Sequence, residues 1–410
     1  MKANRAVLAI LGLIGLSPSA SADVIADWNE RAVALVVARN LPPPPAERVM
    51  AMTHAAMFDA VNSIERKYKP YLIQLSADPG TSQDAAAAAA AATVLAAVNA
   101  HQQPDMAAAL KAYLETIPES PGKTAGVKLG EAVALKILEA RKDDGAVAPD
   151  AYRTNTTPGV YVPTAATWAP HWPGVKPFAI ASAAQFRPAP PIALAGAEWG
   201  TDYNEIKELG RIESKARTPE QTEIARFWLT VSANVYYPVV SSVAADKKLS
   251  VIDSARLFAL TAVARADAFL AVFDAKYHYG FWRPLTAIRH GDNDDNPTTV
   301  RDATWRPIAD TPMHPEYPCA HCIQAASMCR VLEMVIGTAD IAEVAMTSPT
   351  APGVTRRWSN LQNLVAEVSN ARVWAGFHYR FSTRVAEDMG RQIAEHVVKT
   401  IMQPIEVARR

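Results

Sequence analysis

Cysteine is scarce in this sequence of 410 residues. The three cysteines, Cys319, Cys322 and Cys329, lie close together within one short segment. A framework of disulfides spread over the chain is therefore excluded, and the fold has to be held together by a core of packed side chains. Hydrophobic residues make up 50% of the chain and charged residues 20%, which is ordinary for a globular protein and atypical of a disordered one.

An excess of one charge is also lacking, since 41 basic residues balance 41 acidic residues. No overall electric field draws such a protein to nucleic acid or to an anionic membrane, so we expect neither as a partner. Any site for an anion has to be local.

Long apolar runs are absent beyond the N-terminus. Residues 1–22 combine a basic start, an apolar run from Ala6 to Leu16 and the ending Ala20-Ser21-Ala22, which is the pattern of a cleavable secretory signal. A membrane anchor would need about 20 consecutive apolar residues, and no later stretch has that length and hydrophobicity. We expect a soluble mature protein that begins near Asp23 and is periplasmic or secreted.

Helical signals dominate, whereas strand-like alternation is scarce. Thr218 to Gln221 forms a capping box with proline at the first helical position. Ser250 opens a second helix that runs towards Lys276, and a third starts near Cys322 and ends at Gly337. Two more helices are predicted, one carrying Trp358, Leu361, Val365 and Val368 and one starting near Ser382.

A region rich in proline, glycine and tryptophan, from about residue 143 to 200, interrupts these signals. Its Trp168, Trp172, Phe178 and Phe186 need burial, so we expect an irregular but ordered connection. The fold class predicted is all-α, built from helical bundles in two packed halves. The N-terminal half with the connection covers residues 23–215, and the C-terminal bundle covers residues 216–405.

Lys276 and Arg283 are the first candidate site residues. They lie seven positions apart, so a continuing helix would project both cations from nearly one face. Two surface cations with snorkelling side chains are the simpler interpretation. The aromatic residues between them, Tyr277 to Trp282, favour a buried setting, where unpaired cations are costly.

A second candidate segment runs from His314 to His321, directly before the helix that starts near Cys322. A helix N-terminus offers free N–H groups and a partial positive charge to an anion. His321 would lie in the first turn, where it can give or take a proton. A structural role is the alternative for a solitary histidine.

Arg372 and His378 form the third candidate segment. Arg372 shares a helical stripe with Val365 and Val368, so its guanidinium points where a core residue is expected, and a buried arginine needs an anionic partner. His378 follows six positions later. The two side chains converge only if the helix ends between them, which Gly376 allows.

Together these segments resemble the three-part signature Lys-x6-Arg-Pro, Pro-Ser-Gly-His and Ser-Arg-x5-His of vanadium haloperoxidases and type 2 phosphatidic acid phosphatases. The first part is complete from Lys276 to Pro284. The second reads Pro318-Cys319-Ala320-His321, and the third reads Ala371-Arg372-x5-His378. Residues 48–62 are similar to the N-terminal helical region of the bacterial haloperoxidase-like branch.

The resemblance implies roles for these residues around an oxyanion. His378 would be the axial ligand to vanadate or, in a phosphatase, the nucleophile that is phosphorylated. Lys276, Arg283 and Arg372 would neutralise the oxygens of vanadate, or of phosphate in the same site. His321 would be the general acid-base. Cys319 and Ala320 would stand in the binding positions that serine and glycine occupy in the family.

The changes at Cys319 and Ala320 keep other functions open. A thiol is a weaker donor than a hydroxyl, and a thiol beside bound peroxide is prone to oxidation. Cys319 and Cys322 can instead form a redox pair or a disulfide, or bind zinc with His321 and Cys329.

We expect a vanadate-dependent haloperoxidase-like enzyme that oxidises halide with hydrogen peroxide. The alternatives are a secreted acid phosphatase that acts on phosphomonoesters through a phosphohistidine, and a non-catalytic oxyanion-binding or redox-responsive protein. The choice of halide and the oligomeric state stay open.

Overall fold

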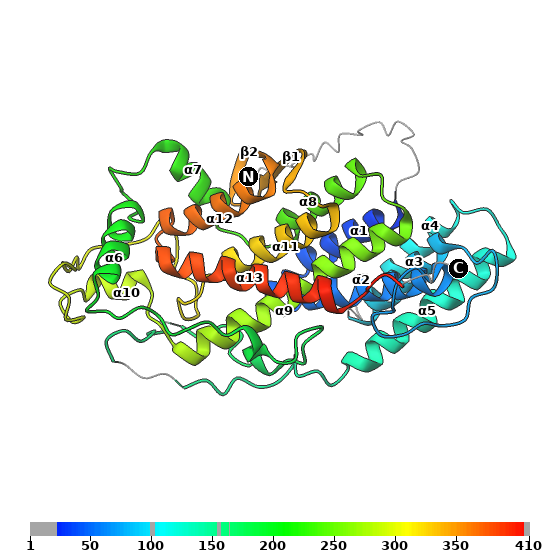
Figure 1. Ribbon diagram of the computed structural model, residues 1–410, viewed down its shortest axis with the longest axis horizontal. Coiled ribbons are helices and arrows are strands. Elements are labelled where there is room, and N and C mark those ends of the chain that lie inside the picture. Colours follow the sequence, from blue (N-terminus) through cyan, green and yellow to red (C-terminus); the bar gives the residue numbers. More distant parts are fainter. Residues whose placement is uncertain (1–22, 99–102, 154–156, 164, 406–410) are drawn as a thin grey trace, which may run out of the picture.

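A computed structural model describes residues 23–98, 103–153, 157–163 and 165–405. The predicted secretory signal lies outside these residues. The described chain is mostly helical, and its longest helices run side by side along the long axis of the molecule (Figure 1). None of the helices in these ranges is both long enough and apolar enough to cross a membrane.

The N-terminal half begins with five helices. Their bounds are α1 Val24–Ala38, α2 Pro43–Glu65, α3 Gln83–Ala97, α4 Gln103–Leu114 and α5 Pro121–Arg141. Helix α3 consists largely of alanine and is capped by Ser82, whose hydroxyl accepts the Ala85 N–H. A Cβ at Gly126 or Gly130 of α5 would overlap the backbone of α3, so small residues on both helices allow close packing.

The connection from residue 143 onward is irregular but ordered, as its aromatic residues predicted. It contains the short 3₁₀ helices η2, Trp172–Gly174, and η3, Ala183–Phe186. The buried carboxylate of Asp267 in α9 accepts the backbone N–H groups of residues 178–180 at 2.7–2.9 Å. These hydrogen bonds attach the connection to the helical core.

Eight helices follow the connection in the described part of the chain. They are α6 Ala197–Leu209, α7 Pro219–Phe227, α8 Ala233–Asp246, α9 Val251–Tyr279, α10 Pro284–Arg289, α11 Ala320–Ile336, α12 Leu361–Trp374 and α13 Arg380–Thr400. The capping box at Thr218 and the cap at Ser250 are both present. Gly337 ends α11 with a positive φ of 81°, as the sequence predicted.

The predicted helix around Trp358 is wrong in its first part. Trp358 lies in an antiparallel hairpin formed by β1, Asp340–Ser348, and β2, Ala351–Asn360. The helix begins only at Leu361, because the side chain of Asn360 caps it by accepting two backbone N–H groups. The buried Val344, Met346 and Trp358 attach the hairpin to the helices. The all-α prediction therefore holds for the main body but lacks this small sheet.

One hydrophobic core joins the two predicted halves. Trp28 of α1, Phe58 of α2, Phe258 of α9 and Leu332 of α11 all belong to the same buried cluster. Helices α9, α11 and α13 lie in the middle of the molecule, and α2 packs along α9 (Figure 1). The boundary at residue 215 stays a prediction.

Candidate functional site

Lys276 and Arg283 come from different structural elements, so the argument from a common helical face was wrong. Helix α9 ends at Tyr279, and Gly280 adopts a left-handed conformation with φ 58°. The chain then turns, and Arg283 becomes the N-terminal cap of α10. Both cations are nevertheless buried, as their aromatic neighbours indicated.

Arg372 and His378 converge because the helix breaks at the predicted glycine. Helix α12 ends at Trp374, and Gly376 has φ 80°. The N–H groups of Phe377 and His378 then return to the carbonyl oxygen of Arg372 at 3.1 and 3.3 Å. The Arg372 guanidinium donates to the carbonyl oxygen of Trp228, and it lies 4.8 Å from the centre of the Phe377 ring.

The candidate residues line a pocket of about 300 Å³. Its wall includes Ala320, His321, Arg372 and His378 of the predicted site, together with His314, which the sequence argument did not single out. Lys276 and Arg283 are not among its lining residues. They lie behind the pocket wall, where the side chain of each donates hydrogen bonds to neighbouring backbone.

Arg283 joins three parts of the site. Its Nη1 lies 3.2 Å from Nε2 of His378 and donates to the carbonyl oxygen of Phe377 at 3.0 Å. Its Nε donates to the carbonyl oxygen of His314, and its Nη2 lies 2.9 Å from Nδ1 of that histidine. Lys276 donates to the carbonyl oxygens of Pro315 and Glu316 at 2.9 and 2.8 Å.

Glu316 is the functional residue that sequence reasoning missed. Its Oε1 lies 2.8 Å from Nδ1 of His378 and accepts the backbone N–H of Tyr379 at 3.1 Å. Both side chains are buried. A carboxylate beside Nδ1 holds the proton there and leaves a lone pair on Nε2, which lies 3.2 Å from Nη1 of Arg283.

The three cations of the site lie in a strongly desolvated setting. Burial, followed by the nearby Arg283, lowers the pKa of Lys276 well below its ordinary value. Burial also lowers the pKa of Arg283 to about 10 and, with Arg283 as the second cause, that of Arg372 to about 9. Each lowered pKa shows that the charged form of the group is costly in free energy, because too little negative charge surrounds it.

The histidines are neutral for the same reason. Burial first, and the neighbouring arginines second, lower the pKa values of His314, His321 and His378 well below the ordinary value. Glu316 differs, because burial raises its pKa to about 7 although Lys276 and Arg283 oppose the shift. With three cations and one carboxylate, the cluster is short of negative charge.

Two buried polar atoms beside the pocket lack a hydrogen-bond partner in the described part of the chain, Nε of Arg372 and Nε2 of His321. Leaving such groups unpaired costs about 1–3 kcal/mol each. An anion with several acceptor oxygens would satisfy the guanidinium and restore the charge balance. Tetrahedral vanadate or phosphate is therefore a ligand that these residues fit.

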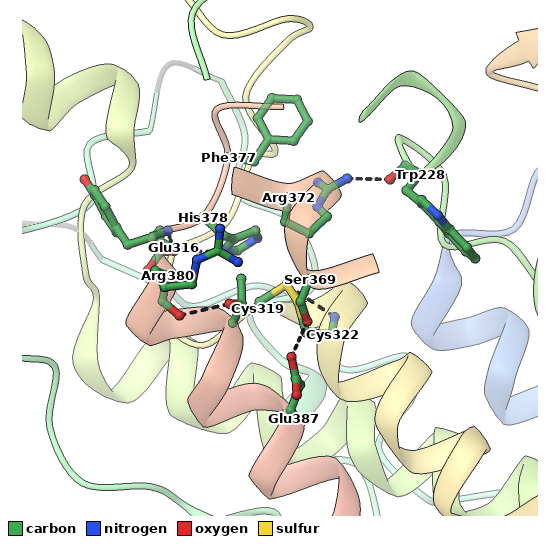
Figure 2. Close-up of a disulfide and its surroundings, with 12 residues drawn as sticks. Trp228, Glu316, Cys319, Cys322, Ser369, Arg372, Phe377, His378, Arg380 and Glu387 are labelled. Carbon is green, nitrogen blue, oxygen red and sulfur yellow. Dashed lines mark hydrogen bonds and ion pairs between the residues drawn. A yellow bond between two sulfur atoms is a disulfide. The ribbon is translucent and has the colours of Figure 1, made fainter. Parts of the chain in front are cut away.

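A disulfide joins Cys319 to Cys322 at the start of α11, close to Arg372 and His378 (Figure 2). Cys319 is the helix cap, and its sulfur accepts the Cys322 N–H at 3.2 Å. A disulfide sulfur has no hydrogen to donate, so Cys319 does not replace the hydroxyl donor as a thiol. Ala320 is an ordinary first helical residue that needs no glycine.

The zinc alternative finds no support in the described part of the chain. No group of three or more histidine, cysteine or acidic side chains there is placed to hold a metal ion. Cys329, the third cysteine, is buried and free.

Comparisons with known proteins bear on the family and the fold. Residues 256–407 match the family described as the VCPO second helical-bundle domain. Over 235 residues the chain is 24% identical to vanadium chloroperoxidase of Curvularia inaequalis, a match that covers 43% of this chain and 39% of that protein's length.

Solved structures resemble the chain over most of its length. A bacterial vanadium-dependent iodoperoxidase has a TM-score of 0.80 at 22% identity, covering 94% of this chain and 98% of its own. A holo bacterial vanadium-dependent chloroperoxidase has a TM-score of 0.70 at 15% identity, covering 87% and 91%.

The helical bundles around a pocket lined by histidines and Arg372 define a protein with the vanadium haloperoxidase type of fold. Residues 256–407 match the VCPO second helical-bundle domain, in agreement with the resemblance that the motifs indicated, and the chain has the fold of the bacterial vanadium haloperoxidases.

Proposed function

We propose that the protein is a periplasmic or secreted vanadate-dependent haloperoxidase that oxidises halide with hydrogen peroxide. One observation carries the proposal. The Nδ1 atom of the buried His378 is held by Glu316, so its Nε2 is left as a neutral donor atom beside a pocket with an excess of positive charge. The similar proteins, which include a chloroperoxidase and an iodoperoxidase, point to the same chemistry.

His378 would hold vanadate through Nε2, while Arg372, Arg283 and Lys276 would balance the charge of its oxygens. Bound vanadate supplies a Lewis acid that activates peroxide towards halide without a redox change at the metal. His321 is neutral and lines the same pocket. It can therefore accept a proton from an incoming peroxide and return it to a leaving oxygen.

An acid phosphatase is the second candidate, because a neutral histidine oriented by a carboxylate is also a nucleophile for phosphoryl transfer. The same three cations would then stabilise the transferring phosphoryl group, and His321 would protonate the leaving alcohol. The third candidate, a non-catalytic oxyanion-binding protein, follows from the disulfide that occupies the position of the family's hydroxyl donor.

Two assays on the purified protein separate these functions. Bromination of a diketone that requires bromide, peroxide and added vanadate would support the peroxidase. Hydrolysis of an aryl phosphate, inhibited by vanadate, would support the phosphatase. The peroxidase proposal fails if vanadate binds but neither bromide nor iodide is oxidised in the presence of peroxide.

His378→Ala should abolish bromination, and His396→Ala is a matched control, because His396 is a half-buried histidine of α13 that does not line the pocket.

A further inference from the structure

A second pocket lies between the N-terminal helices and the irregular connection. Its volume is about 440 Å³, and its wall is formed by α2, α5 and η2 and by the residues at the C-terminal ends of α1 and α3. Pockets of about 300–1,000 Å³ are typical of small-molecule sites. Pro45 of α2 lines this pocket, whereas Pro43 lines the pocket beside His378, and the two pockets share no lining residue. The second pocket is therefore a cavity of its own.

The charged side chains of this second pocket are all basic. Its lining residues include no acidic one within the described ranges, and the basic ones are Arg39, Arg48, Arg141 and Lys142. Arg48 and Arg141 share a single carboxylate, that of Asp144, at 2.7 and 2.9 Å. Arg39 donates to a backbone carbonyl oxygen and pairs with none of the described carboxylates. The pocket therefore has an excess of positive charge.

Arg48 has a guanidinium nitrogen that is not used elsewhere. Its Nε donates to Asp144, and its Nη2 donates to the carbonyl oxygen of Arg141 at 2.9 Å, so the group is held in one orientation. Its Nη1 has no hydrogen-bond partner among the residues that the structure describes, and the side chain is 18% exposed. Burial, with a smaller contribution from Arg48, lowers the pKa of Arg141, although Asp144 opposes the shift. A further negative charge would stabilise both guanidinium groups.

Most of the remaining wall is aliphatic. Val49 and Met52 of α2, Leu138 of α5 and Val98 after α3 line the pocket. Trp172 is the one aromatic residue among the lining residues, and it is almost fully buried. An aromatic ligand would find little ring surface to stack on. A flexible alkyl chain can follow the aliphatic side chains and displace water from them.

We propose that this pocket is a binding site for a medium-chain carboxylate. The carboxylate group would accept a hydrogen bond from Nη1 of Arg48, and the exposed Arg39 would add to the attraction. The alkyl chain would lie along Met52 and Leu138. This site is separate from the pocket beside His378, so it does not depend on the proposed function.

The test is the binding of decanoate to the purified protein, measured by isothermal titration calorimetry. Each additional buried CH₂ group should tighten binding by up to about fourfold, so the affinity should rise from hexanoate through octanoate to decanoate. Decanol, which has the same chain without the charge, should bind at least about tenfold more weakly. If decanoate does not bind, or binds no more tightly than hexanoate or decanol, the proposal is wrong.

Arg48→Gln should weaken decanoate binding about tenfold, because a hydrogen bond to a charged group is lost. The fold should survive, since Arg141 still pairs with Asp144. Arg356→Gln is the matched control. The Arg356 side chain is also 18% exposed and paired with a carboxylate, but it lies outside this pocket.

Leu138→Asp is a second variant, which places a carboxylate in the aliphatic wall. It should weaken decanoate binding through repulsion between like charges and through the loss of apolar contact. Leu135→Asp is its control, because Leu135 is an exposed leucine of the same helix outside the pocket.

The position of the ligand is tested in the protein saturated with vanadate and in His378→Ala. Decanoate should bind unchanged in both, because the two pockets share no lining residue. Loss of binding in either case would place decanoate in the pocket beside His378 and overturn the proposal, as would wild-type affinity in both Arg48→Gln and Leu138→Asp. Binding that is weakened in these two variants and kept in their controls supports the site, whether or not the protein oxidises halide.

Discussion

The carboxylate of Glu316 lies 2.8 Å from Nδ1 of His378, although 62 residues separate the two in the sequence. The same oxygen accepts the N–H of Tyr379, and the side chain of Lys276 donates a hydrogen bond to the backbone carbonyl oxygen of Glu316. The imidazole ring is thereby fixed at one nitrogen, and the other nitrogen keeps its lone pair, which lies 3.2 Å from Nη1 of Arg283. We regard Glu316 as the positioning residue of the site.

Glu316→Gln should distinguish a direct bond between His378 and vanadate from purely electrostatic binding of an anion. The amide oxygen can still accept from His378 and Tyr379, so the fold should survive, but one negative charge is lost. Sulfate, which is bound by charge alone, should bind more tightly. The affinity for vanadate should rise less than that for sulfate, or fall, because His378 becomes a weaker electron-pair donor in the ligand bond. We expect the preference for vanadate over sulfate to fall by roughly 10–100-fold, measured by competition in calorimetry.

Glu387→Gln is a matched control, because Glu387 is a half-buried carboxylate of α13 that pairs with Arg391 and does not line the pocket. If Glu316→Gln raises the affinities for both anions by the same factor, Glu316 acts only through its charge and does not position His378.

Anion binding should depend on pH through Glu316. Its pKa is about 7, whereas His314, His321 and His378 stay neutral because their pKa values are well below the ordinary value. As the pH falls from about 8 to about 6, Glu316 gains a proton and the site becomes more positive. Sulfate affinity should therefore rise by about tenfold. Calorimetry across this range should show the rise in the wild type and a much flatter profile in Glu316→Gln.

The sequence predicted those parts of the site that depend on local spacing. His321 in the first turn of α11, the inward Arg372 and the break at Gly376 each follow from helix periodicity and from a residue that ends a helix. The pairing of Glu316 with His378 depends on how two loops meet in three dimensions, which no local spacing encodes. The only signal was the position of Glu316 inside the segment from His314 to His321.

The helices were predicted well because capping residues mark their ends, as Thr218, Ser250 and Gly337 do. The hairpin β1–β2 was missed because buried and exposed residues do not alternate regularly along its strands, whose pairing contains two register shifts. Trp358 fitted a helical stripe with Leu361 and Val365 by coincidence, and Asn360 between them is the true cap. Tertiary packing overrode the periodic pattern at this point.

Replacing both Cys319 and Cys322 with serine should separate the disulfide's structural role from its effect on the site. Closing so short a loop contributes about 2 kcal/mol, so the double variant should melt at a lower temperature. Serine is also a good helix cap, so it should offset part of the lost stability. Its hydroxyl can donate to an oxygen of vanadate, a bond worth about 0.5–1.5 kcal/mol.

Vanadate affinity of this variant, measured by the shift in melting temperature, should rise by up to roughly tenfold. Cys329→Ser is the control for the loss of a thiol, because Cys329 is buried and free. Unchanged affinity in the double variant would show that residue 319 does not face the bound oxyanion.

Away from the pocket, Arg265 and Glu47 form a buried ion pair with Nη2 and Oε1 2.6 Å apart, and both side chains are almost completely buried. The Tyr237 hydroxyl donates to the second oxygen of Glu47, and the guanidinium lies over the Tyr236 ring. Arg265→Met should lower the free energy of unfolding by about 3–5 kcal/mol, because Glu47 is left buried without its partner.

The double variant Arg265→Met with Glu47→Leu should recover most of this loss, because two buried charges are removed together. Two guanidinium nitrogens of Arg265, Nε and Nη1, lack a hydrogen-bond partner among the described residues, which makes the wild-type pair costly to bury. The exposed pair of Arg357 and Glu343 is the control, and Arg357→Met should change the unfolding free energy by less than about 1 kcal/mol. Urea unfolding curves give all three values. A double variant as unstable as Arg265→Met alone would mean that the core depends on the shape of the two side chains and not on their charges.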